Sequence, residues 1–119
     1  MDYSNRATEM FDVNWANDHD LYVTTLCVAR VVLRERPGAS DVQLGEAVLR
    51  FYRELWGAGG WAEESPLARM KRDVGSWHAV DAGEIGESVR DSLGEEGVAE
   101  VMSPVFYPMP SYPPGPRQT

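Results

Sequence analysis

The fold is decided by one stretch of the chain, SDVQLGEAVLRFYRELWG, which spans residues 40–57. It opens with a capping box, in which the Ser40 hydroxyl and the Gln43 side chain each bind the other residue's free backbone amide. Apolar residues then recur every three or four positions, which places them on one side of an α-helix that Gly57 ends. That side consists of Leu44, Val48, Phe51 and Leu55, widened by Ala47, Tyr52 and Trp56.

A second helix is predicted upstream, over residues 18–36. The carboxylate of Asp18 or Asp20 caps its first turn, and a Pro-Gly pair stops it. Its segment LYVTTLCVARVVL, residues 21–33, is apolar on nearly every side. This is typical of a helix at the centre of a bundle, or of one partly covered by another chain. Cys27 lies among valines there, so we expect a small buried thiol rather than a reactive one.

Two more helices are predicted downstream. Ser65 is a typical N-cap followed by proline, and the apolar spacing continues that helix to about Trp77. A second capping box begins at Asp81 and opens the next helix. Within it, Gly83 and Gly86 each weaken the helix by up to ~1 kcal/mol. Its apolar side consists of Ile85, Val89 and Leu93.

These elements predict an all-α fold, a small bundle of four to five helices over residues 1–103. A last short helix is expected over residues 95–102. No helix signal precedes residue 18, so Trp15 is expected in an irregular segment, as is Trp61 in a glycine-rich loop. We expect both indoles to be half exposed, as aromatic anchors at interfaces are.

The chain changes character at residues 104–119, which hold six of its eight prolines. Proline excludes helix and central strand, so we expect an extended arm in the polyproline II conformation. Phe106, Tyr107 and Tyr112 are its large anchors, and we expect them to bind a larger partner protein or a second copy of this chain. The alternative is that the arm packs across the chain's own helices.

Composition excludes several classes of protein. A formal net charge of −8 argues against direct nucleic-acid binding, because a polyanion repels an acidic surface. The longest apolar stretch has 13 residues, whereas a membrane span needs about 20. The single cysteine excludes an internal disulfide, and the acidic N-terminus is the reverse of a signal peptide, which together favour the cytoplasm. Ten of the eleven basic residues are arginine, which favours a GC-rich bacterial or phage genome.

Acidic residues gather in residues 80–103, with seven acids against one base. Glu84, Glu87 and Asp91 recur at spacings of three and four, which places them on one side of the predicted helix, and Glu95 continues that side if the helix does. We call this side the acidic ridge. It is suited to binding a basic partner or to imitating a nucleic-acid backbone. The alternative is a solvated helix side that keeps the protein soluble.

The candidates for catalysis are few. Asp18, His19 and Asp20 form the most enzyme-like cluster, and His78 is the only other histidine. Adjacent helical residues point about 100° apart, so the cluster cannot converge on one ion, and capping explains it without a metal. Asp18, His19 and His78 therefore remain the catalytic candidates, and we expect no metal and no cofactor.

The sequence favours a small acidic non-catalytic protein that acts by protein–protein interaction, as an accessory subunit, an adaptor or an inhibitor. The alternative is a small subunit of a hetero-oligomeric enzyme, contributing Asp18, His19 or His78 to a shared active site. A helical DNA-binding regulator is the least favoured, because the one compact basic patch is largely neutralised by its neighbours. That patch consists of Arg69, Lys71 and Arg72.

Overall fold

A computed structural model describes residues 3–96 of the chain. The all-α fold is confirmed: residues 3–96 form five α-helices and one short 3-10 helix, with no strand among them. The short helix expected over residues 95–102 falls largely outside this range, and the proline-rich arm, residues 104–119, lies wholly outside it. The elements are α1 (Arg6–Asn17), α2 (His19–Glu35), α3 (Asp41–Gly57), α4 (Pro66–Val74), η1 (Trp77–Ala79) and α5 (Ala82–Glu96).

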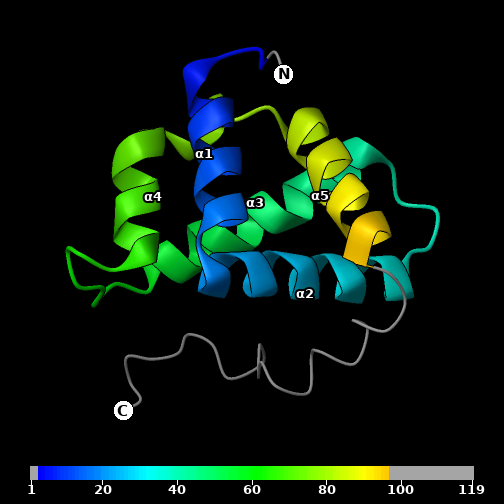
Figure 1. The fold of residues 1–119 in the computed structure, drawn as a ribbon, viewed down its shortest axis with the longest axis horizontal. Coiled ribbons are helices and arrows are strands. Elements are labelled where there is room, and N and C mark those ends of the chain that lie inside the picture. Colours follow the sequence, from blue (N-terminus) through cyan, green and yellow to red (C-terminus); the bar gives the residue numbers. More distant parts are fainter. Residues whose placement is uncertain (1–2, 97–119) are drawn as a thin grey trace.

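The helices share one core. Figure 1 shows α2 along the lower edge of the bundle, with α1 and α5 standing on it and α4 on the far side of α1. Helix α3 crosses behind α1 and packs along α5. No helix among residues 3–96 is long and apolar enough to cross a membrane.

Helix α3 begins and ends where the sequence predicts. Ser40 Oγ accepts a hydrogen bond from the Gln43 amide at 3.1 Å, and Gln43 Oε1 accepts one from the Ser40 amide at 2.9 Å. One detail of the apolar side differs, because Phe51 is half-buried whereas Tyr52 is fully buried. The Tyr52 hydroxyl lies 2.8 Å from Thr25 Oγ1 and donates to the Leu21 carbonyl at 3.1 Å, so its polar end is satisfied inside the core.

Helix α1 is the element that sequence analysis missed. The Asn5 side chain caps it by accepting from the Thr8 amide at 2.8 Å. The expectation that Trp15 is half exposed in an irregular segment is wrong, since Trp15 lies in α1 and is 0% exposed. Its indole is buried because Asp12 accepts the ring N–H at 2.7 Å. Thr8, Phe11 and Trp15 recur at helical spacing, a signal that would have revealed the helix.

Helix α4 is shorter than predicted. It ends at Val74, because Gly75 adopts a φ of 82° that L-residues rarely reach and that breaks the helical path. Trp77 therefore lies in η1 rather than in α4, although it is still buried and packs edge-on to Phe11. The separate η1 connects the α4 end of the bundle to the start of α5.

Two glycines bring α3 and α5 into backbone contact. A Cβ placed on Gly45 would lie 1.8 Å from the Ala82 carbonyl oxygen, and one on Gly86 would lie 1.8 Å from the Asp41 carbonyl oxygen. Neither position has room for any side chain. The expectation that Gly86 merely weakens α5 is therefore incomplete, because its missing side chain is what lets the two helices approach so closely.

Candidate functional site

The acidic ridge lies on the side of α5 that faces away from the core. Ile85 and Val89 point inward and are 0% exposed. Glu87 and Asp91 are exposed and Glu84 is half-buried. Glu95 belongs to α5 by its backbone, and its side chain lies outside the described part of the chain.

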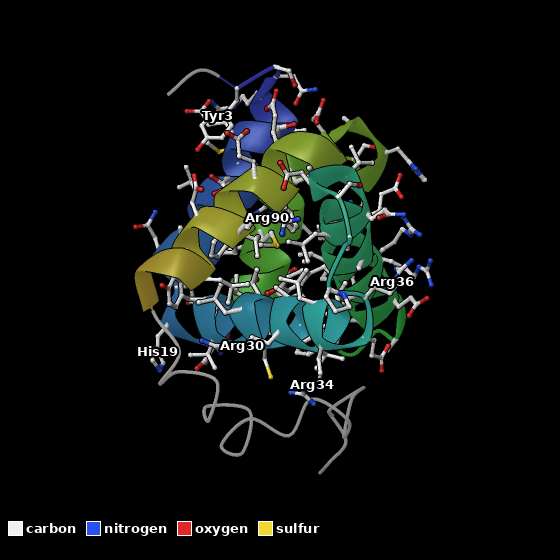
Figure 2. All side chains as sticks on the ribbon, turned by 90° about the vertical axis from the view of Figure 1, so that its right-hand side faces the viewer. Tyr3, His19, Arg30, Arg34, Arg36 and Arg90 are labelled. Carbon is white, nitrogen blue, oxygen red and sulfur yellow. The ribbon has the colours of Figure 1, made fainter. Side chains whose placement is uncertain are left out.

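The only basic residue of α5 does not neutralise the acidic ridge. Arg90 Nε donates to Asp41 Oδ1 at 2.8 Å, and Arg90 Nη2 donates to the Ala39 carbonyl at 2.8 Å. Figure 2 shows Arg90 between α5 and the start of α3, on the flank of the helix. Its guanidinium is therefore occupied by Asp41 of α3 and by Ala39 just before that helix, and no basic residue of α5 compensates the charge of the ridge carboxylates.

The N-terminus of α5 is held by α1 and the residues before it. Asp81 Oδ1 accepts from the Glu84 amide at 3.0 Å, as the predicted capping box requires. The second half of the box differs, because the Asp81 amide donates to Thr8 Oγ1 at 2.8 Å rather than to Glu84. The freed Glu84 carboxylate accepts from the Ser4 amide at 3.1 Å, which joins this end of the ridge to the N-terminal segment.

A buried carboxylate joins α1 to the middle of α5. Asp12 is 6% exposed and accepts three hydrogen bonds: from the Trp15 indole at 2.7 Å, the Tyr3 hydroxyl at 2.7 Å and the Ser88 hydroxyl at 3.0 Å. The hydrogen bond to Asp12, together with burial and nearby negative charges, raises the pKa of Tyr3 to about 12. These contacts fix α5 from a second direction, so the acidic ridge is presented on a rigid helix.

The catalytic candidates are not brought together. Asp18 Oδ1 accepts from the Leu21 amide at 3.0 Å, so this carboxylate caps α2, as one of the two predicted alternatives requires. His19 is exposed at the first turn of α2 and points away from the bundle in Figure 2. His78 is exposed in η1, between α4 and α5. Among residues 3–96 no three His, Cys, Asp or Glu side chains are placed to share a metal ion.

Trp61 and the basic patch border one open pocket. Trp61 is half-buried, and its indole N–H donates to the Leu55 carbonyl at 2.9 Å. With Trp56 and Arg72 it lines a pocket of about 340 Å³ beside α4. Lys71 Nζ donates to the Gly75 carbonyl at 2.6 Å and lies over the Trp77 ring, so part of the basic patch serves local structure.

The anchors expected in the arm, Phe106, Tyr107 and Tyr112, lie outside the described residues, as does the rest of the proposed partner-binding segment. Comparison of the chain with known protein families, with curated proteins and with solved structures finds no match. Sequence reasoning missed the role of Asp12, because the position of an acid among apolar residues does not indicate which three groups donate hydrogen bonds to it. It also missed the engagement of Arg90, whose partner Asp41 is 49 residues away.

Proposed function

We propose that this protein is a small non-catalytic adaptor, accessory subunit or inhibitor that works in the cytoplasm by binding a larger basic protein. The acidic ridge of α5 is the contact surface. The observation that carries the proposal is the position of Arg90, which is held by Asp41 and Ala39 and so leaves Glu84, Glu87 and Asp91 without a counter-charge on their own helix.

Rigidity supports the same function. The ridge is fixed by the glycine contact with α3 and by the Asp12 hydrogen bonds, so its carboxylates keep their spacing when a partner approaches. Fixed charges of one sign accelerate association with an oppositely charged surface and select against partners of the same sign. A nucleic-acid-binding protein presents such a basic surface, and occupying it would inhibit that protein. The lone Cys27, which has no partner for an internal disulfide, suits a reducing compartment.

The test uses the tagged full chain in three forms. One is unchanged, one carries Glu84→Lys, Glu87→Lys and Asp91→Lys, and a matched control carries Glu46→Lys, Glu63→Lys and Glu64→Lys at exposed positions elsewhere. Both variants change the net charge by the same amount. Proteins retained from a lysate of the source organism are identified by mass spectrometry between about 0.05 M and about 1 M salt, a range in which the Debye length falls to about 3 Å.

The expected result is a basic protein that the unchanged chain and the control retain at low salt and that the ridge variant loses. Its retention by the unchanged chain falls steeply as salt rises, because the contact is charged. Equal retention by the ridge variant, or retention that salt leaves unchanged, overturns the proposal.

A further inference from the structure

The side of α2 that faces away from the bundle combines basic and apolar residues. Thr25 contacts Tyr52 of α3 and Ala29 is 0% exposed, so these two residues face the core. A helix turns about 100° per residue, and Cys27, two positions from both, therefore lies on the opposite side. We call this the outer side of α2. By helical spacing it consists of Val23, Cys27, Arg30 and Arg34.

Figure 2 shows Arg30 and Arg34 along the lower edge of α2, away from α3. Neither Figure 1 nor Figure 2 shows another described helix on that edge. Burial raises the pKa of the Cys27 thiol, and the charges of Arg30 and Arg34 oppose this rise, which agrees with both guanidinium groups lying near the sulfur.

Arg30 is buried there with no hydrogen-bond or ion-pair partner among the described residues 3–96. The residue is 9% exposed, and within residues 3–96 no hydrogen bond or ion pair reaches its guanidinium. Cys27, next to it on the outer side, is 1% exposed. A guanidinium carries five donors, and taking it out of water without acceptors is strongly unfavourable. The Arg30 guanidinium therefore needs hydrogen-bond acceptors that the described helices do not supply.

The described part of the chain ends beside α2 (Figure 1). Helix α5 packs against α2, and Figure 1 shows its C-terminal end beside α2. Residues 97–119 follow. Helix α2 has 17 residues and is therefore about 25 Å long. An extended proline-rich chain advances about 3.1 Å per residue, so fewer than ten residues of the arm would span the whole helix.

The arm can also supply the hydrogen-bond acceptors and stacking partners that Arg30 does not find among the described helices. A polyproline II segment makes no internal hydrogen bonds, so its backbone carbonyls are free to accept from a guanidinium. Aromatic rings stack on guanidinium planes, and residues 104–119 include Phe106, Tyr107 and Tyr112. Val23 and Cys27 provide apolar surface beside the charge. The arm contains one charged side chain, Arg117, so its acceptors are carbonyls and its stacking partners are rings.

We infer that the outer side of α2 is the docking site for this chain's own proline-rich arm, residues 104–119. Arg30 donates to backbone carbonyls of the arm, and an aromatic ring of the arm covers Cys27. This assignment favours the chain's own helices over the partner expected from sequence alone. It is independent of the proposed function, since the acidic ridge on α5 stays free.

Cys27 is the only cysteine of the chain, so the rate at which its thiol is labelled shows whether the outer side of α2 is covered. The experiment measures the rate at which a thiol-specific reagent labels Cys27 in full-length protein. The unchanged chain is compared with Phe106→Ser, Tyr107→Ser and Tyr112→Ser combined, and with a control carrying Ser111→Ala, Gln118→Ala and Thr119→Ala. Circular dichroism checks that every form keeps its helices.

Labelling of the unchanged chain and of the control is expected to be slow. The anchor variant is expected to react about tenfold faster or more, because labelling follows the population in which the arm has left α2. Arg30→Met, which removes the donors and keeps the bulk, is expected to accelerate labelling as well. It tests the same contact should the anchor variant fold poorly. A cysteine placed at exposed Val13 in a Cys27→Ser chain is expected to react equally with and without the anchors.

Three results overturn the inference. Fast labelling in the unchanged chain means that nothing covers the outer side of α2. Slow labelling that survives both the anchor substitutions and Arg30→Met means that the bundle protects Cys27 by itself. Protection that weakens on dilution of the unchanged chain assigns the covering to a second copy.

Discussion

Helix α5 is held on its two sides by opposite means. Toward α3 the two backbones meet where side chains are absent, at Gly45 and Gly86, and the Arg90 hydrogen bonds to Asp41 and Ala39 lie on the flank of this glycine contact. Toward α1 it depends on polar atoms, since Asp12 accepts from Ser88 and Thr8 accepts from the Asp81 amide. The first of these, the glycine contact, contains no ionisable group and tolerates no added atom. The second tolerates changes of shape but depends on each donor and on its protonation.

The largest effect is expected where an atom is added to the glycine contact. Gly86→Ala places a methyl group against the Asp41 carbonyl, which is backbone and cannot turn away, so the two helices must separate. We expect a loss of about 3 kcal/mol or more in the free energy of unfolding, measured by urea denaturation, and a similar loss for Gly45→Ala.

Gly94→Ala is the matched control for this prediction. Gly94 lies in the same helix, and a Cβ there would meet nothing within 4 Å. Since alanine favours helix over glycine, this change is expected to stabilise the protein by up to about 1 kcal/mol. If Gly86→Ala proves as harmless as Gly94→Ala, the close contact between α3 and α5 does not exist in solution.

The two contacts also differ in how far sequence predicts them. The start of α3 and the inward side of α5 are local features, so capping residues and helical spacing were enough to find them. The role of Gly86 depends on Asp41, which is 45 positions away in the chain, and locally the glycine predicts only a weaker helix. A close approach between two helices produces no repeating pattern in the sequence of either helix.

The polar contact was harder still to predict. The spacing of Thr8, Phe11 and Trp15 is a local signal of helix α1, whereas nothing local shows that the Asp12 carboxylate lets the Trp15 indole be buried. The acidic ridge itself was predictable, since it needs only the spacing of acids within one helix. The hydrogen bond from Arg90 to Asp41 was not predictable, because it joins the beginning of α3 to the middle of α5.

The second prediction removes the acceptor at the centre of the polar contact. Asp12→Ala leaves the buried Trp15 N–H without a partner, and also removes the acceptor of Tyr3 and Ser88. We expect a loss of about 2–3 kcal/mol in the free energy of unfolding. Asp91→Ala makes the same chemical change at an exposed position of α5 and is expected to stay within about 0.5 kcal/mol. Similar losses for the two variants would show that Asp12 is no more buried in solution than Asp91.

The smallest expected effect is a dependence on alkaline pH that only the polar contact has. Tyr3 donates to Asp12 at 2.7 Å, and its pKa is raised to about 12 by that hydrogen bond, by burial and by the negative charges of Asp12, Glu9 and Glu84. In the unfolded chain the phenol has a pKa of about 10. Between these values the unfolded chain has released the proton that the folded chain retains, so the free energy of unfolding falls as pH rises.

The contribution of Tyr3 is therefore complete below pH of about 10 and is lost as pH approaches about 12. Tyr3→Phe is expected to cost about 1 kcal/mol near neutral pH, and this cost should shrink across that window in urea denaturation at successive pH values. Ser88→Ala removes another donor to the same carboxylate and no ionisable group, so its cost should stay constant over the same range. Because both variants share every other titrating group with the unchanged chain, the difference between their profiles isolates the Tyr3 proton. A cost for Tyr3→Phe as constant as that for Ser88→Ala would mean that Tyr3 ionises as it does in water, with no hydrogen bond to Asp12.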